Sequence, residues 1–167
     1  MYLKRLVLFV LATIILGMNI CPQALAYSEK SDIKETAYNY DDGSYLIVRV
    51  EEINSNQSLF ATASTKTFSK TTTYYNSSDV AQCSLTVIAS FSIVSGKSVT
   101  CTGVSYETSS FDDNWSVENV STSRNNSSNS QSSGTASGDF IKRVLGVKIN
   151  TVDVSVTVSC DYNGNYW

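Results

Sequence analysis

Histidine is absent from this sequence of 167 residues, and proline occurs only once. Without an imidazole, the Ser–His and Cys–His arrangements of nucleophilic catalysis are excluded, and the commonest metal-binding side chain is missing. A long amphipathic helix and a cluster of basic residues are lacking as well. We therefore expect a protein that is not an enzyme and that needs no cofactor or metal.

The N-terminal residues 1–26 have the features of an export signal. Lys4 and Arg5 form a basic start, residues 6–17 are almost entirely apolar, and Ala24-Leu25-Ala26 offers the small-residue pattern of a signal peptidase site. The apolar run is too short to cross a bilayer. We expect cleavage after Ala26 and secretion of the remainder, with the signal peptide as its only membrane contact.

Negative charge prevails in residues 27–167, which contain ten Lys or Arg and fifteen Asp or Glu and so carry a net charge of −5. A negative domain repels phosphate backbones, which argues against nucleic acid as a partner. Ser, Thr, Val and Tyr are abundant, and these residues favour strands over helices.

Short alternating segments at regular spacing predict one all-β domain over residues 44–167. We expect an antiparallel, immunoglobulin-like β-sandwich with about seven strands. A glycine, Gly103, marks a β-bulge where the inward parity of its strand changes. Residues 27–43 read as a flexible N-terminal arm. The Ser- and Asn-rich stretch 121–138 fits a linker-like loop or a polar hairpin equally well.

Three cysteines follow the signal, in a compartment where one disulfide and one free thiol is the simplest arrangement. The alternating strand 83–94 and the glycine turn after it place Cys101 opposite Ser92, on the order of 30 Å from Cys83, which is beyond disulfide reach. Cys160 ends another strand and can meet either of them. We favour Cys101–Cys160, with Cys83 as a small buried residue.

Aromatic side chains near predicted turns are the best candidates for ligand binding, because rings on loops provide stacking surfaces. For Trp115, a place in the core is the alternative. The candidate binding residues are Tyr74, Tyr75, Trp115, Tyr166 and Trp167.

Two groups of Asp and Asn side chains have spacings that suggest other chemistry. Asp161, Asn163 and Asn165 have the spacing of the first ligands of a calcium loop, but the bidentate acid that completes such a loop does not follow, so a turn is favoured. Asp112 and Asp113 would be the carboxylates of a hydrolase, but adjacent acids in a turn more often accept hydrogen bonds from backbone amides.

Several short motifs in a fixed order carry a resemblance. They are Tyr-Tyr-Asn (74–76), Val-Thr-Cys-Thr (99–102), Asp-Asn-Trp (113–115), Lys-Arg-Val-Leu-Gly-Val (142–147) and Val-Thr-Val-Ser-Cys-Asp-Tyr-Asn-Gly (156–164). Over residues 60–165 the chain resembles small exported proteins of Gram-positive, largely gut-dwelling bacteria that have no established activity. The resemblance includes the positions of Cys101 and Cys160 and thus supports their pairing. It implies an exported β-rich fold and no particular chemistry.

The sequence favours a secreted, non-enzymatic protein that binds a surface glycan, a wall polymer or a protein through loop aromatics. A membrane-active or toxin-like protein is the alternative, because the alternation of residues 152–159 is also typical of pore-forming hairpins. Its candidate insertion hairpin, 121–138, lacks apolar residues. A carboxylate-based hydrolase is the third and least favoured class.

Overall fold

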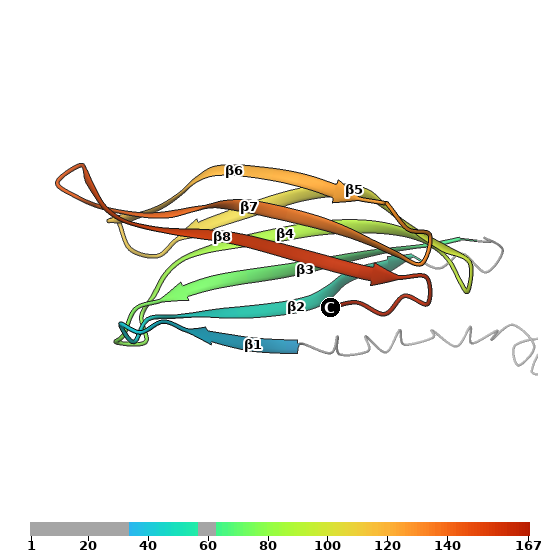
Figure 1. Ribbon diagram of the computed structural model, residues 1–167, viewed down its shortest axis with the longest axis horizontal. Helices are drawn as coiled ribbons and strands as arrows, with labels where there is room; N and C mark the ends of the chain where they lie inside the picture. Colours follow the sequence, from blue (N-terminus) through green and yellow to red (C-terminus); the bar gives the residue numbers. More distant parts are fainter. Residues whose placement is uncertain (1–33, 57–62) are drawn as a thin grey trace, which may run out of the picture. The chain divides into compact units, whose positions relative to one another are not determined.

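The computed structural model describes residues 34–56 and 63–167, and the predicted signal peptide lies outside them. In the described part, all regular structure is β-strand. Eight strands form two antiparallel sheets, one of five strands in the order β1-β2-β3-β4-β5 (sheet A) and one of three in the order β6-β7-β8 (sheet B). Figure 1 shows that successive strands lie side by side within each sheet.

The strands follow one another through short connections. Their bounds are β1 Lys34–Asn39, β2 Tyr45–Asn56, β3 Ser64–Tyr75, β4 Ala81–Val94, β5 Ser98–Ser110, β6 Trp115–Asn125, β7 Gln131–Val144 and β8 Val147–Asp161.

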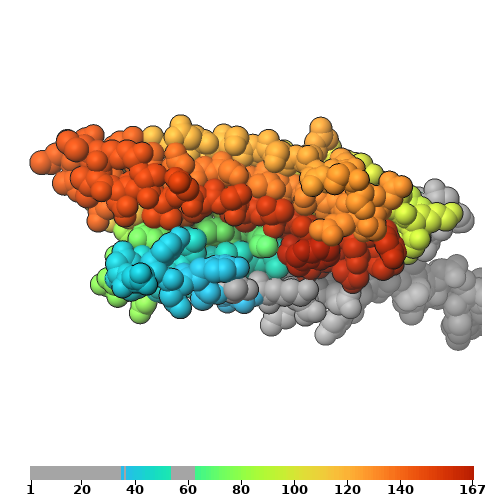
Figure 2. All heavy atoms as spheres, in the orientation of Figure 1, coloured from blue at the N-terminus to red at the C-terminus, as the bar shows by residue number. Residues whose placement is uncertain are grey.

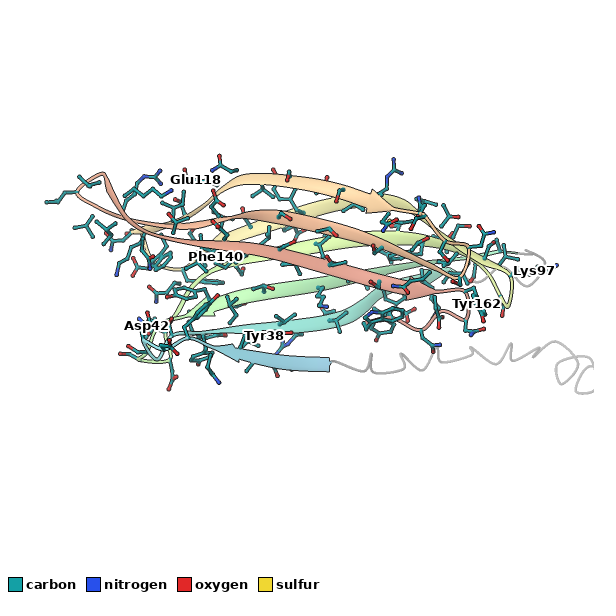
Figure 3. The ribbon with its side chains drawn as sticks, viewed as in Figure 1. Tyr38, Asp42, Lys97, Glu118, Phe140 and Tyr162 are labelled. Carbon is teal, nitrogen blue, oxygen red and sulfur yellow. The ribbon has the colours of Figure 1, made fainter. Side chains whose placement is uncertain are left out.

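Alternation of side chains determines which face of each strand is buried. In β4, Leu85, Val87, Ala89 and Phe91 are fully buried, and half-buried residues separate them. Strands β7 and β8 contribute buried residues from the other sheet to the same cluster, including Phe140 (labelled in Figure 3). The two sheets therefore share one hydrophobic core, whose burial provides the main driving force for folding.

The structure adds to the predicted strands and corrects them. Residues 34–39, which we placed in a flexible arm, form the edge strand β1 and pair with Tyr45–Val50 of β2. The turn between the two strands is closed by hydrogen bonds from the Tyr40 amide to Ser44 and from the Gly43 amide to Tyr40, which bring this polar segment beside β2. The stretch 121–138 forms a hairpin between β6 and β7, so the hairpin alternative is confirmed over the linker. The described residues contain eight strands, where about seven were expected.

A bulge on β5 confirms the prediction at Gly103. The pairing of β4 with β5 shifts where Ser90 faces Gly103 and Phe91 faces Cys101, which leaves Thr102 unpaired. The predicted hairpin register is wrong by one residue. Cys101 lies opposite Phe91 and not Ser92, because the turn contains three residues with Gly96 in the left-handed region (φ 69°).

The predicted Cys101–Cys160 disulfide is not present in the structure. All three cysteines of the described residues are free and buried. The Cys101 thiol donates to the carbonyl oxygen of Gly103 at 3.6 Å, and the Cys160 thiol donates to that of Asp161 at 3.4 Å, so each sulfur is directed at its own strand. Burial raises the pKa of both Cys83 and Cys160 to about 12.

These buried thiols predict a labelling pattern for protein comprising residues 27–167. Iodoacetamide at pH 8 should leave the folded protein almost unmodified, because the thiolate is the reactive form and burial disfavours it. In denaturant without reductant, three carbamidomethyl groups should appear in the intact mass. A single group, with the other two cysteines joined, would show that the Cys101–Cys160 bridge forms after all.

Gly134 of β7 allows the two sheets to approach closely. A Cβ atom at this position would lie 2.7 Å from a methyl group of Val104 and 2.8 Å from Cβ of Ala89, both in sheet A. Contacts this short force neighbouring atoms to move in a closely packed core. A side chain at position 134 is therefore incompatible with the present distance between the sheets.

The substitution Gly134→Ala should lower the free energy of unfolding by about 1–3 kcal/mol, the usual cost of overpacking a core. Chemical denaturation measures this difference. Gly103→Ala is the matched control, because a Cβ there meets nothing within 4 Å, and it should change stability by less than about 0.5 kcal/mol. Equal effects of the two substitutions would contradict the close-approach argument.

Candidate functional site

Four connections meet at one end of the two sheets, at the left in Figure 1. They join β1 to β2, β3 to β4, β5 to β6 and β7 to β8. We call this region the loop end and define it as residues 40–44, 76–80, 111–114 and 142–149. Several exposed apolar side chains occur here, and they make this end the candidate site.

The β7–β8 hairpin carries the most exposed apolar residue of the described chain at its tip. Leu145 is 99% exposed, and Val144, Val147 and Ile149 beside it are exposed as well. Figure 2 shows the hairpin projecting at the left end of the molecule. Its tip is a two-residue turn in which Leu145 and Gly146 both have positive φ, 51° and 81°.

Leucine is an unfavourable residue for this turn. Two-residue hairpins with positive φ at both positions favour Asn-Gly or Asp-Gly. A left-handed conformation costs an ordinary L-residue roughly 1–2 kcal/mol. Leu145 therefore combines an unfavourable backbone conformation with complete exposure of an apolar side chain, and neither feature benefits the fold.

An ion pair fixes the base of the hairpin. The Arg143 guanidinium donates to both carboxylate oxygens of Glu118 on β6 (labelled in Figure 3) and, at 3.0 Å, to the Ser116 hydroxyl. The Arg143 amide donates to the carbonyl oxygen of Asn114 at 2.7 Å. These bonds connect the hairpin to β6 and to the β5–β6 turn, so its direction is fixed even though its tip packs against nothing.

Further apolar and aromatic residues accompany the hairpin at the loop end. Phe111 is 59% exposed, and Val80 in the β3–β4 connection is also exposed. The rings of Tyr45 and Tyr75 stack with centroids 5.0 Å apart, and the Tyr45 hydroxyl donates to Asp79 at 3.1 Å. Sequence patterns did not single out Phe111 or Leu145, because isolated apolar residues beside turns resemble strand ends.

The aromatic residues that we predicted as a binding face do not lie together on the surface. Trp115 (6% exposed) and Tyr74 are buried in the core with their ring centroids 5.0 Å apart. Tyr166 stacks on Phe68 at 4.3 Å. Trp167 remains partly exposed, but its backbone pairs with Ser159, far from the loop end. Of the five predicted residues, only Tyr75, the last residue of β3, borders the loop end.

The candidate calcium residues form a turn. Asp161 accepts hydrogen bonds from the amides of Asn163 and Asn165 at 2.8 and 2.9 Å and from the Asn165 side chain at 2.8 Å. Burial would raise the pKa of Asp161, but the hydrogen bonds from Asn165 and Asn163 lower it below its usual value. Its carboxylate oxygens are therefore already occupied by N–H donors.

The predicted carboxylate pair at the β5–β6 connection also serves a turn. Asp112 accepts from the backbone amide of Asn114 at 2.8 Å and from its side chain at 3.0 Å. In the part of the chain that the structure describes, no group of three or more metal-binding side chains occurs.

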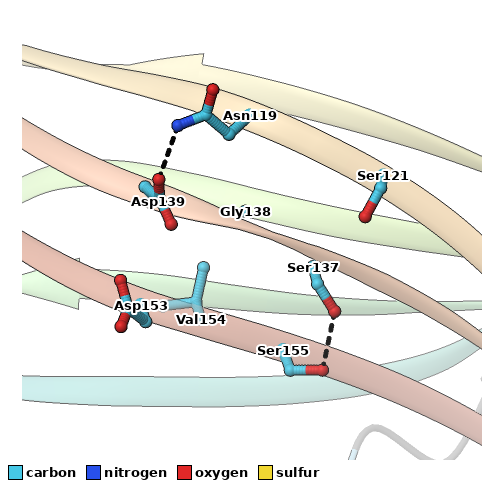
Figure 4. Close-up of a pocket in the computed structure, with 8 residues that line it drawn as sticks. All are labelled: Asn119, Ser121, Ser137, Gly138, Asp139, Asp153, Val154 and Ser155. Atoms are coloured by element: carbon cyan, nitrogen blue, oxygen red, sulfur yellow. Dashed lines mark hydrogen bonds between the residues drawn. The ribbon is translucent and has the colours of Figure 1, made fainter.

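A shallow polar depression lies on the outer face of sheet B (Figure 4). It has a volume of about 350 Å³ and follows the bulge of β6, where Asn119 has φ 53° and donates to Asp139 at 2.7 Å. Asp139 and Asp153 are direct cross-strand partners. Like charges in this position repel one another. The hydroxyls of Ser137 and Ser155 bond to each other at 2.9 Å.

Comparisons with known proteins give no relative: no family model, no curated protein and no solved structure matches. Within residues 34–56 and 63–167, no helix is long and apolar enough to span a membrane. The loop end must therefore be interpreted from its own geometry.

The ion pair at the base of the hairpin predicts a pH dependence. Hydrogen bonds from Arg143 and then Ser116 lower the pKa of Glu118 to about 2, from an ordinary value of 4.5. Its contribution to stability is therefore present above pH 4.5 and is lost as the pH falls toward 2. Glu118→Gln should lower the melting temperature at pH 7, and this difference should disappear near pH 2.

Glu107→Gln is the control, because Glu107 is exposed and belongs to none of the ion pairs of the described residues. Its effect should be small at every pH. A Glu118→Gln effect of equal size at pH 7 and pH 2 would contradict the role of the ion pair.

Proposed function

We propose that this chain is a secreted, non-enzymatic β-sandwich that binds another protein through its loop end. The shared core of the two sheets supports the sandwich architecture. Strand order is consecutive within each sheet, whereas immunoglobulin domains use Greek-key connections. The likeness that we propose to such domains is therefore one of architecture.

Leu145 is the observation that carries this proposal. Its backbone is strained (φ 51°), and strained residues cluster at catalytic and ligand-binding sites. An aliphatic tip, with Val144 and Val147 beside it, is suited to an apolar pocket on a protein surface. Sugars are recognised mainly by flat rings, and the most exposed residue of the loop end carries none. This favours a protein over a glycan or a wall polymer.

A substitution at the tip separates binding from stability. Leu145→Asn creates the preferred Asn-Gly turn and should raise the free energy of unfolding by about 1 kcal/mol. It should also weaken binding of the labelled protein to its target cells by about tenfold or more, because a buried apolar anchor is lost. Flow cytometry on cells of the producing strain and on cultured epithelial cells measures binding.

Ile53→Asn is the matched control, since Ile53 is an exposed aliphatic residue in β2, away from the loop end. It should leave binding unchanged. Prior treatment of the cells with protease should abolish binding, and treatment with periodate should not. Binding that is sensitive to periodate would assign a glycan, and binding unaffected by Leu145→Asn would contradict the proposal.

The same hairpin favours a membrane-active protein as the second candidate. Lys142 and Lys148 flank its apolar tip, and apolar residues bordered by cations suit a lipid interface. This hairpin replaces 121–138, our predicted insertion segment, which is polar. Leakage or flotation with vesicles of phosphatidylcholine and phosphatidylglycerol tests it: binding lost in Leu145→Asn would favour the membrane.

A further inference from the structure

We infer that the edge of β8 is a second binding site, which receives one extended segment of a partner protein as an added β-strand. The site lies between the sheets and is distinct from the loop end. Its chemistry consists of free backbone groups on β8, an apolar floor from sheet A and the ammonium group of Lys70.

The unequal width of the sheets creates this site. Strand β8 packs over β3 and β4, so sheet A extends past β8 by β2 and β1. Neighbouring strands are about 4.8 Å apart, so the overhang is about two strands wide. A groove of about 410 Å³ follows this overhang, and Figure 2 shows it between the red-orange β8 and the blue-to-cyan β1 and β2.

Backbone groups of β8 face the groove in a regular alternation. Ser159 exchanges two backbone hydrogen bonds with Trp167, 3.1 and 3.2 Å long, so Ser159 directs both its N–H and its C=O away from β7. The pairing of β8 with β7 has no irregularity between Thr151 and Asp161. By the two-residue period of an antiparallel strand, Asp153 and Thr157 face the same way.

Ser155 lies between Asp153 and Thr157 in β8 and directs its backbone N–H and C=O to the same side. In the described chain, β7 is the only strand beside this stretch, so the outward groups of residues 153, 155 and 157 have no neighbouring strand. On either side the edge is occupied: Trp167 covers Ser159, and the Asn150 side chain accepts the amide of Thr151 at 2.8 Å. The open stretch coincides with the β8 residues that line the groove, 153–157.

The floor of the groove determines which segment fits. Leu46 and Val48 of β2 are half-buried there, and Tyr38 of β1, labelled in Figure 3, is 57% exposed at its rim. Stacked sheets are about 10 Å apart. An added strand would therefore place every second side chain on this floor, and these side chains should be apolar.

Lys70 adds a charge requirement. It occupies an inward position of β3, between the buried residues Phe68 and Thr72, and lines the groove. Burial lowers the pKa of Lys70. The other inward lysine of β3, Lys66, pairs with Glu52 at 3.3 Å, whereas Lys70 belongs to none of the ion pairs of the described residues. A carboxylate of the added segment would form an ion pair with the Lys70 ammonium group.

One strand fits this site better than a second copy of the chain. If two copies paired through β8, the overhanging strands β1 and β2 of one copy would clash with the same strands of the other copy. An isolated extended segment meets no such obstacle. The partner is therefore a chain of alternating apolar residues with one acidic residue opposite Lys70, bound by strand addition.

A synthetic heptapeptide tests this inference. It alternates threonine with valine and carries glutamate at its central inward position; a control peptide has glutamine there. Amide hydrogen exchange, followed by NMR on the full domain, should show new protection at Asp153, Ser155 and Thr157 when the glutamate peptide is added. Saturating peptide without protection at these amides would overturn the inference.

Two substitutions test its parts. Lys70→Met should weaken binding of the glutamate peptide by about tenfold, the effect of losing one charged hydrogen bond, and should make the two peptides bind equally. Ser155→Pro removes an outward N–H and should abolish binding, whereas Ser155→Ala, which retains the N–H, should not. A preference for glutamate that persists in Lys70→Met would contradict the role of Lys70.

The result of the peptide experiment does not depend on whether the loop end binds a protein. Leu145→Asn should leave peptide binding unchanged, so either site can fail alone. Sedimentation of the free protein provides a last check. If the three amides are already protected in a dimer that dissociates on dilution, the edge is a contact between copies and the inference is wrong.

Discussion

A three-stranded sheet that must cover a five-stranded one is the constraint on which the rest of this structure depends. Both sheets bury their inner residues in one core, but the strands β6, β7 and β8 are too few to cover all of sheet A. Strand β7 lies over β4 and β5, and there Gly134 allows the sheets to approach closely. Toward β1 the covering layer ends. The inward residues of β4 are all buried, whereas β3 includes the half-buried Lys70 and β2 the half-buried Leu46 and Val48. Apolar burial decreases along the same direction, so stability is concentrated on one side and accessible surface on the other.

The two candidate sites lower the stability of the fold in different ways. At the hairpin tip, the loss is local: Leu145 adopts a left-handed conformation and exposes its side chain, while Arg143 and Glu118 hold the base. At the groove, the loss is a missing neighbour for β8 and a half-buried ammonium group without an ion pair in the described chain. Neither feature follows from optimal packing, and natural sheets usually shield an open edge. These two features are the basis of the two binding sites that we propose.

Sequence patterns predicted the strands well where alternation was strict. Residues 83–94 alternate between apolar and polar side chains, and β4 spans nearly the same range. Gly103 marked the bulge because a parity change needs an extra residue. In contrast, the apolar residues Val144, Leu145 and Val147 hide the turn between β7 and β8. The aromatic face was mispredicted for a related reason: Tyr74 and Trp115 stand next to turns in the sequence, but the inward parity of their strands directs both rings into the core. Position relative to a turn does not determine exposure, whereas parity does.

The groove could not be predicted from the sequence, because it arises from the relation between two sheets. The inward face of β3 contains Lys66, Phe68, Lys70 and Thr72, a pattern with little apolar contrast that resembles a solvent-facing strand. Only the structure shows that the two lysines differ: Lys66 meets Glu52, and Lys70 lies under the open edge of β8. Natural sheets shield such edges with charge, proline or covering loops. Here the backbone is shielded at Thr151 and at Ser159, and residues 153–157 between them are not shielded. An edge that is occupied at Thr151 and at Ser159 and open between them is limited to pairing with a short single strand. This limit keeps most of β8 from pairing with other chains and so lowers the risk of aggregation.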